Sequence, residues 1–127
     1  MGQQQLLLIV LGVIVVGIAV VVGINLFNAN ATSANRDGVI SDLNNLGAMA
    51  QQFYKKPTSM GGGGNKFTGW TIPTGLDSTA NGSYSPTVSA SSVTIVGTGT
   101  ETGNDGTNKV KATATVTANT ISVAVDN

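Results

Sequence analysis

The fold is decided by one segment near the N-terminus, Leu6-Leu-Leu-Ile-Val-Leu-Gly-Val-Ile-Val-Val-Gly-Ile-Ala-Val-Val-Val-Gly-Ile-Asn-Leu-Phe27, in which Asn25 is the one strongly polar residue. As a helix with a rise of about 1.5 Å per residue, this run would reach roughly 33 Å, enough to cross the ~30 Å hydrocarbon core of a bilayer. No Lys, Arg, Asp or Glu precedes Arg36. We therefore expect residues 1–28 to form an apolar helix that is buried in lipid, in copies of itself, or in both.

Two ordinary interpretations of this run compete with that expectation. A secretory signal peptide has a basic n-region, an apolar stretch of about 7–15 residues and a small-residue cleavage site. Residues 28–31, Asn-Ala-Asn-Ala, could supply the site, but residues 1–5 hold no Lys or Arg and the apolar run is too long. A single-pass anchor fits the length, although anchors usually carry flanking Lys or Arg that set their orientation. Because both flanks are Gln and Asn here, we expect a helix that enters a membrane and also leaves it for another apolar environment.

The composition excludes several functional classes. The 127 residues have a net charge of zero and only 9 % are charged, against about 25 % in typical domains, so a basic nucleic-acid-binding surface is not expected. The chain has no Cys and no His, which removes disulfides, thiolate metal sites, Cys-attached haem and the commonest general base. We expect no enzyme activity, no cofactor and no metal site, because no two carboxylates stand at a spacing that suggests a shared site. The carboxylates are Asp37, Asp42, Asp77, Glu101, Asp105 and Asp126.

The expected second unit, residues 29–127, begins with the continuation of the helix. Polar residues at 28–33 are expected to bend or loosen it, because their side chains compete for backbone hydrogen bonds. Apolar residues then recur in steps of three and four, and Lys55, Lys56 and Pro57 suit a helix end. We expect the helix to run from about residue 4 to residue 56. The stripe expected to pack on a sheet is Ile40, Leu43, Leu46, Ala50 and Phe53, and the opposite, polar face carries Asp42, Asn44, Asn45, Gln51 and Gln52.

From Ser83 onward the pattern alternates with a period of two and is rich in β-branched residues, which predicts strands. Pro86 places the first of them at an edge of the sheet, because proline cannot donate to a ladder. Turns are expected at residues 102–107 and at Ala118-Asn119. The predicted strands are residues 84–88, 92–98, 110–117 and 120–125.

The segment between helix and sheet contains four consecutive glycines, and Met60–Lys66 is expected to be a flexible connector. Trp70 is expected to fill the space between the helix stripe and the sheet. The predicted fold class is thus α+β, a long N-terminal α-helix with a small antiparallel sheet of three to four strands packed on its C-terminal half.

An apolar N-terminal helix that continues as an amphipathic helix and carries a short β-sheet resembles the type IV pilins and their pseudopilin relatives. At the level of residues the resemblance covers mainly Gln5–Gly23. It implies a membrane-anchored precursor, removal of a leader after Gly by a prepilin peptidase, methylation of the new N-terminus, and helices packed in a filament core. Most family members carry Glu at the fifth mature position. Gln5 occupies that position if Met1 is the mature start, and Leu7 occupies it if cleavage follows Gly2 and Gln3 is the first residue.

The resemblance predicts the major structural subunit of an extracellular type IV pilus-like filament for attachment or motility, held in the cytoplasmic membrane before assembly. Its partners would be copies of itself, the prepilin peptidase and the assembly machinery, with no nucleic acid. The alternatives are a pseudopilin of a secretion or DNA-uptake machine and a single-pass membrane-anchored surface β-domain that binds a partner. Asn30-Ala-Thr32 and Asn81-Gly-Ser83 match the N-glycosylation acceptor pattern. The expected filament-core residues are Gln5, Leu6, Leu8, Gly12, Val15, Gly17, Val20, Gly23 and Phe27.

Overall fold

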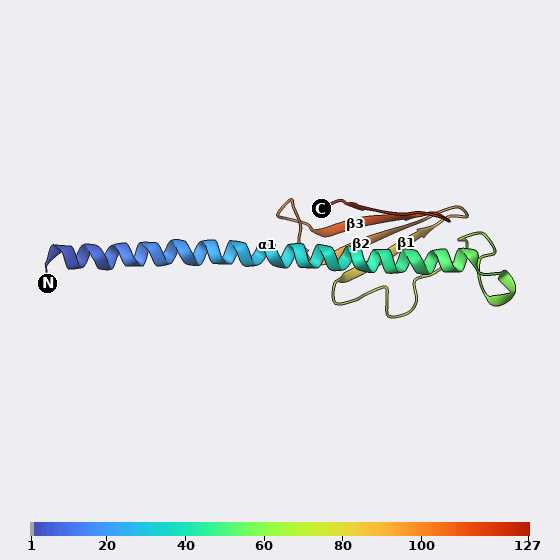
Figure 1. Cartoon of the computed structure of the whole chain (residues 1–127), viewed down its shortest axis with the longest axis horizontal. Helices are drawn as coiled ribbons and strands as arrows, with labels where there is room; N and C mark the ends of the chain where they lie inside the picture. Colours follow the sequence, from blue (N-terminus) through green and yellow to red (C-terminus); the bar gives the residue numbers. More distant parts are fainter. Residues whose placement is uncertain (1) are drawn as a thin grey trace. The chain divides into compact units, whose positions relative to one another are not determined.

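The computed structural model describes residues 2–127, apart from the side chain of Asn25, and Met1, one of the two expected mature N-termini, lies outside the described residues. The chain divides into two compact units, Met1–Ala31 and Thr32–Asn127. One helix, α1, runs from Gln3 to Lys55 and belongs to both (Figure 1). A short 3₁₀ turn, η1 (Thr58–Met60), follows the helix, and the strands are β1 (Gly82–Val88), β2 (Val93–Thr102), β3 (Lys109–Val116) and β4 (Ile121–Val125).

The four strands form one antiparallel sheet in the order β1-β2-β3-β4, so each strand pairs with the next along the chain. In the second unit this sheet lies along the C-terminal part of α1 (Figure 1). The predicted α+β fold class is confirmed, with the fourth strand present and Pro86 on an edge. The turn between β3 and β4 is also as expected, since the N–H of Thr117 donates to the carbonyl oxygen of Thr120 at 2.8 Å across Ala118-Asn119.

The helix continues through residues 28–33, so the expected loosening there is not found. Polar side chains weaken a helix when they hydrogen-bond to its own backbone. The hydroxyl of Thr32 has another partner, because it donates to the carbonyl oxygen of Thr102 at the end of β2 at 3.1 Å. The sheet therefore uses a side chain that would otherwise compete with the helix.

The core of the second unit lies between α1 and one face of the sheet. Leu43, Leu46 and Ala50 of the stripe are buried there together with Trp70, and Phe53 packs partly buried against them. Ile40 is half-buried and lies outside this cluster, whereas its neighbour Val39 is fully buried. The sheet contributes alternate residues, as a period of two requires. They are Tyr84 of β1, Val93 and Ile95 of β2, and Ala112, Ala114 and Val116 of β3.

Glycines set how closely the helix and the sheet approach. Gly97 continues the buried face of β2, and a Cβ at this position would lie 2.9 Å from Cγ1 of Val39 on the helix. On the helix side, a Cβ at Gly47 would lie 3.1 Å from Cγ2 of Val116. Such positions mark a close approach of two backbones. The alternation of β2 therefore includes glycine where a larger side chain would separate the two layers.

The glycine segment after α1 forms an ordered cap rather than the simple flexible connector that we expected. The N–H of Gly63 donates to the carbonyl oxygen of Phe53 at 2.8 Å, and the N–H of Asn65 donates to that of Tyr54 at 2.7 Å. The N–H of Gly64, whose φ is +59°, donates to the carbonyl oxygen of Lys56 at 3.0 Å. The last carbonyl groups of a helix have no partner within the helix, so this loop satisfies them and ends α1.

Replacing Leu43 by Ala is expected to lower the free energy of unfolding by about 2–5 kcal/mol, because a fully buried side chain leaves a cavity. The matched control is Leu76→Ala, since the Leu76 side chain is 36 % exposed and its loss should have a clearly smaller effect. Thermal or denaturant unfolding of the full-length chain in detergent measures both. Equal losses in the two variants would contradict the packing described here.

Candidate functional site

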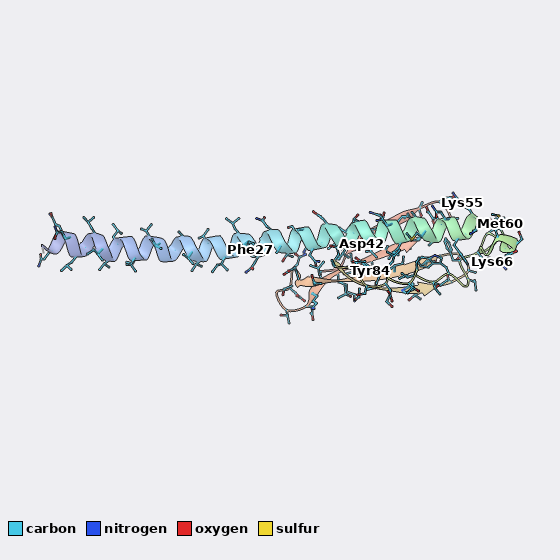
Figure 2. The ribbon with its side chains drawn as sticks, turned by 90° about the horizontal axis from the view of Figure 1, so that it is seen from below. Phe27, Asp42, Lys55, Met60, Lys66 and Tyr84 are labelled. Carbon is cyan, nitrogen blue, oxygen red and sulfur yellow. The ribbon has the colours of Figure 1, made fainter. Side chains whose placement is uncertain are left out.

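The largest candidate site is the apolar surface of α1, which we define as the side chains of Leu6–Leu11, Val13–Val16, Ile18–Val22, Ile24, Leu26 and Phe27. Every large hydrophobic side chain in this set is between 51 % and 74 % exposed. These side chains project from all sides of the helix up to Phe27 (Figure 2). By length and composition, α1 contains one segment that is able to cross a membrane, and none of that segment is buried within the chain. The sheet covers most of the stripe on the second half of α1, whereas no part of the chain covers this apolar surface, so the two halves of α1 need different environments.

The glycines of this surface stand in open space. A Cβ added at Gly12, Gly17 or Gly23 would meet no other side chain within 4 Å. Ala19 lies seven residues after Gly12 and Gly23 lies eleven after it, close to two and three turns of about 3.6 residues, so these small residues share one face of the helix. Small residues let two helices approach closely in an apolar medium. The face can therefore accept another helix, and Gly17 lies away from it.

The other expected filament-core residues belong to the same surface, except Gln5, which directly precedes it. Gln5 is exposed in the first turns of α1, where its N–H donates to the carbonyl oxygen of Gly2 at 3.2 Å. Leu6, Leu8, Val15, Val20 and Phe27 are all exposed.

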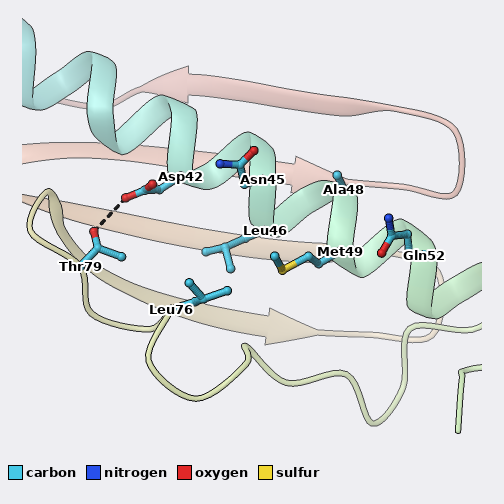
Figure 3. A pocket seen from close by; sticks show the side chains of 8 residues that line it. All are labelled: Asp42, Asn45, Leu46, Ala48, Met49, Gln52, Leu76 and Thr79. Carbon is cyan, nitrogen blue, oxygen red and sulfur yellow. Dashed lines mark hydrogen bonds between the residues drawn. The ribbon is translucent and has the colours of Figure 1, made fainter.

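A second feature, in the unit Thr32–Asn127, is a hydrogen-bonded cluster around Asp42. Its Oδ2 atom accepts hydrogen bonds from the Tyr84 hydroxyl at 2.5 Å, the Thr79 hydroxyl at 2.8 Å and Nδ2 of Asn81 at 3.1 Å. Figure 2 labels Asp42 and Tyr84, and Figure 3 shows the bond from Thr79. The sequence analysis placed Asp42 on the polar face of the helix opposite the stripe, and this placement is wrong. Asp42 lies at the border of the buried stripe, where it joins α1 to β1 and to the loop before it.

The cluster shifts the acid–base equilibria of both ionisable partners. Burial raises the pKa of Asp42, but hydrogen bonds from Tyr84, Asn81 and Thr79 favour the carboxylate more strongly, and the pKa ends below its ordinary value of 3.8. Burial and the bond to Asp42 raise the pKa of Tyr84 above its ordinary value of 10.0. The phenol therefore stays protonated at neutral pH and serves as a hydrogen-bond donor, not as a base.

A groove of about 330 Å³ opens beside this cluster, between α1 and the loop that carries Leu76 and Thr79 (Figure 3). Leu46, Met49 and Leu76 give it apolar walls. Its one carboxylate, Asp42, already accepts from three donors through Oδ2. Within residues 2–127, acidic side chains do not gather in any group of three or more that could hold a metal ion.

Asn35 is a buried residue that the sequence analysis did not identify. Its Oδ1 atom accepts from the N–H groups of Thr100 and Glu101 at 3.1 and 3.3 Å, and its Nδ2 atom donates to the carbonyl oxygen of Asn81 at 2.7 Å. The two bonds to Oδ1 come from β2 where its register with β3 shifts, between Thr98 and Thr102. A bulge leaves backbone groups without ladder partners, and Asn35 supplies them. Its position four residues before Val39, in line with the stripe, is the sequence signal that could have identified it.

The two acceptor patterns for N-glycosylation differ in their surroundings. Asn30 is exposed on α1. The side chain of Asn81 is half-buried, and its Nδ2 atom, to which a sugar would be attached, donates to Asp42. Modification of Asn81 would therefore break a bond of the Asp42 cluster, whereas modification of Asn30 would break none that the structure records.

Comparison with known proteins gives no match to a family model, a curated protein or a solved structure.

Asp42→Asn is expected to weaken the dependence of stability on acid. Because the pKa of Asp42 is lower in the folded than in the unfolded chain, its stabilising contribution is present above about pH 4 and is lost as the pH falls through the folded pKa. Asp105, whose pKa the N–H of Thr107 and the Asn108 side chain hold at about 2, retains its own contribution. Melting temperatures at pH 7 and pH 3 measure the effect, with the exposed Asp37→Asn as control. The same pH dependence in Asp42→Asn and the wild type would contradict the role of the cluster.

Asn35→Ala is expected to destabilise the second unit by about 1–3 kcal/mol, because two N–H groups of the bulge lose their acceptor. Asn44→Ala, at an exposed position of the same helix, should leave stability almost unchanged. Denaturant unfolding compares the two variants, and amide hydrogen exchange at Thr100 and Glu101 gives the local readout. Unchanged protection of both amides in Asn35→Ala would show that the side chain does not hold the bulge.

Proposed function

We propose that this chain is the major structural subunit, a pilin, of an extracellular type IV pilus-like filament for surface attachment or motility. In this proposal the apolar surface of α1 packs against copies of itself in the filament core, and the sheet-bearing unit forms the outer part. The observation that carries the proposal is the exposure of every large apolar side chain of Leu6–Phe27, on all sides of the helix. Before assembly, the same surface holds the subunit in the cytoplasmic membrane.

A helix with apolar side chains on every face requires an apolar environment on every side. Full burial of one Val, Leu or Ile side chain is worth about 1.5–3 kcal/mol, so a helix with apolar side chains on every face does not remain in water. Lipid satisfies it, and so does a bundle of identical helices. The small-residue face of Gly12, Ala19 and Gly23 supports the bundle, because helices in an apolar medium associate by close packing rather than by hydrophobic driving force.

The absence of charged residues beside the apolar helix supports a subunit that can move from the membrane into a filament. Residues 1–35 carry no charged side chain, so no Lys or Arg fixes this segment at a membrane surface. The sheet-bearing unit is rich in Thr, Ser and Asn, and its acidic and basic residues balance to no net charge. A pseudopilin would have the same helix and sheet, and a membrane-anchored surface domain would have the same spanning segment.

Shearing of the cell surface separates these functions. Electron microscopy and mass spectrometry of the sheared material should find long fibres made of this 12.8 kDa chain. Recovery of the chain only as detergent-soluble monomers from the membrane would favour the anchored surface domain. Short assemblies that stay with the cell envelope would favour the pseudopilin. Either result would overturn the proposal of a major pilin.

Val15→Asp and Val20→Lys are expected to abolish the fibres. A charge at the centre of a membrane helix costs at least about 2.5–3.5 kcal/mol even in lipid, and both side chains are more than half exposed on the apolar surface. Ser85→Asp, which adds a charge at an exposed position of β1, is the control and should assemble normally. Normal fibres from either helix variant would show that residues 6–27 do not form the filament core.

A further inference from the structure

The two edges of the sheet are unlike each other. On β1, the backbone groups of alternate residues point away from β2, beginning with Gly82 and Tyr84. The loop before β1 occupies them, because Gly82 exchanges backbone hydrogen bonds with Thr79, and the N–H of Tyr84 donates to the carbonyl oxygen of Asp77 at 2.9 Å. The next residue in this series is Pro86, which has no N–H. From Gly82 to Pro86, the β1 edge therefore has no N–H group available to a further strand, a kind of protection that sheet edges commonly have.

The β4 edge has no such protection. The N–H of Asp126 donates to the carbonyl oxygen of Lys111 at 2.8 Å, and Thr117 bonds to Thr120 in the same register. In an antiparallel ladder every second residue faces its partner strand, so Ile121, Val123 and Val125 direct their backbone groups away from β3. The structure records no hydrogen-bond partner for these groups among the described residues. The strand carries no charged residue and no proline, and the Val125 side chain is 45 % exposed.

We infer that the β4 edge is a self-association site, at which β4 of a second copy of this chain pairs antiparallel with it around Val123. The outward groups lie symmetrically about this residue. A two-fold pair centred there brings Val123 opposite Val123 of the second copy, and Ile121 opposite Val125, so that each of these pairs exchanges two backbone hydrogen bonds. The β1 edge of a second copy offers no free N–H group between Gly82 and Pro86, so it would not complete this ladder. The β4 edge of a second copy offers both N–H and carbonyl groups at each of the three outward positions.

The side chains are compatible with this register. The pair places Val125 beside Ile121 of the second copy, so the exposed Val125 side chain gains an apolar neighbour. Asp126, the residue after β4, stands opposite Thr120 of the second copy and not opposite a like charge. No repulsion between identical charges therefore opposes the self-pairing of this edge.

The arrangement also leaves room for the helices. A two-fold axis perpendicular to the sheet keeps both copies of α1 on the same face of a continuous eight-stranded sheet. The two β3 strands would stand three strand spacings apart, roughly 14 Å, whereas packed helices need about 8–10 Å. The helix segments over the two sheets run in opposite directions. The pairing therefore suits two copies of the second unit that point in opposite directions, not neighbours that point the same way.

Engineered cysteines test the pairing directly, because the chain has none of its own. In the proposed register Ser122 faces Ala124 of the second copy, with Cα atoms about 4.5 Å apart, within the range of a disulfide. Full-length Ser122→Cys and Ala124→Cys chains, mixed in detergent and mildly oxidised, should form a mixed disulfide dimer. Ser122→Cys mixed with Thr87→Cys, at an exposed position of the β1 edge, is the matched control. A mixed dimer no more abundant than in this control would overturn the inference.

Val123→Pro tests whether the backbone is responsible. It removes an N–H that points away from β3, and so should abolish the mixed disulfide, while Val123→Ala, which also loses the side chain but keeps the N–H, should retain it. Val125→Lys leaves the ladder with β3 unchanged. It should also weaken the cross-link, because it places one Lys of each copy beside the apolar Ile121 of the other. Persistence of the dimer in folded Val123→Pro or in Val125→Lys would overturn the inference. None of these measurements requires a filament, so their failure is separate from that of the proposed function.

Discussion

The structure depends on one constraint, which is that the first half of α1 carries apolar side chains on every face and has no sheet to cover it. A helix with an apolar stripe can be satisfied by one layer, as residues 39–50 are by β2 and β3. A helix that is apolar all round needs an apolar environment in every direction. The division of the chain into Met1–Ala31 and Thr32–Asn127 follows this difference in what each half of the same helix has to contact.

The second unit shows how a small domain with no net charge connects its helix and its sheet. Close packing through Gly47 and Gly97 brings the helix and the sheet together. Polar side chains then connect the layers at their borders, with Asn35 holding the bulge of β2 and Asp42 holding Tyr84 of β1. Gln51 adds a further link, since its Nε2 atom donates to the carbonyl oxygen of Thr117 at 3.1 Å. Between the helix and the sheet, hydrogen bonds that involve neutral side chains, the Asp42 carboxylate and the Arg36 guanidinium take the place that ion pairs occupy in other domains.

Among the described residues, the apolar surface of α1 and the β4 edge both lack recorded partners, and the two surfaces differ in kind. The apolar surface of α1 offers area on all sides but few directional groups, so it can associate with lipid or with several helices. The β4 edge offers directional backbone groups in a fixed register and accepts a single strand. An assembly built from both surfaces would use the first for bulk association and the second for a specific, directional contact.

The sequence by itself determined the periodicities, and with them the helix, the strands, the turns and the apolar character of Leu6–Phe27, because these depend on neighbours in the chain. It also placed Leu43, Leu46, Ala50 and Trp70 at positions that the structure buries. Only the tertiary structure decided the roles of Asn35 and Asp42, because polar residues beside a stripe face solvent unless a distant segment reaches them. The cap formed by Gly63 and Gly64, and the difference between the two sheet edges, were decided in the same way. Each depends on hydrogen bonds between residues that are not neighbours in the sequence, and the local pattern of residue types does not predict such bonds.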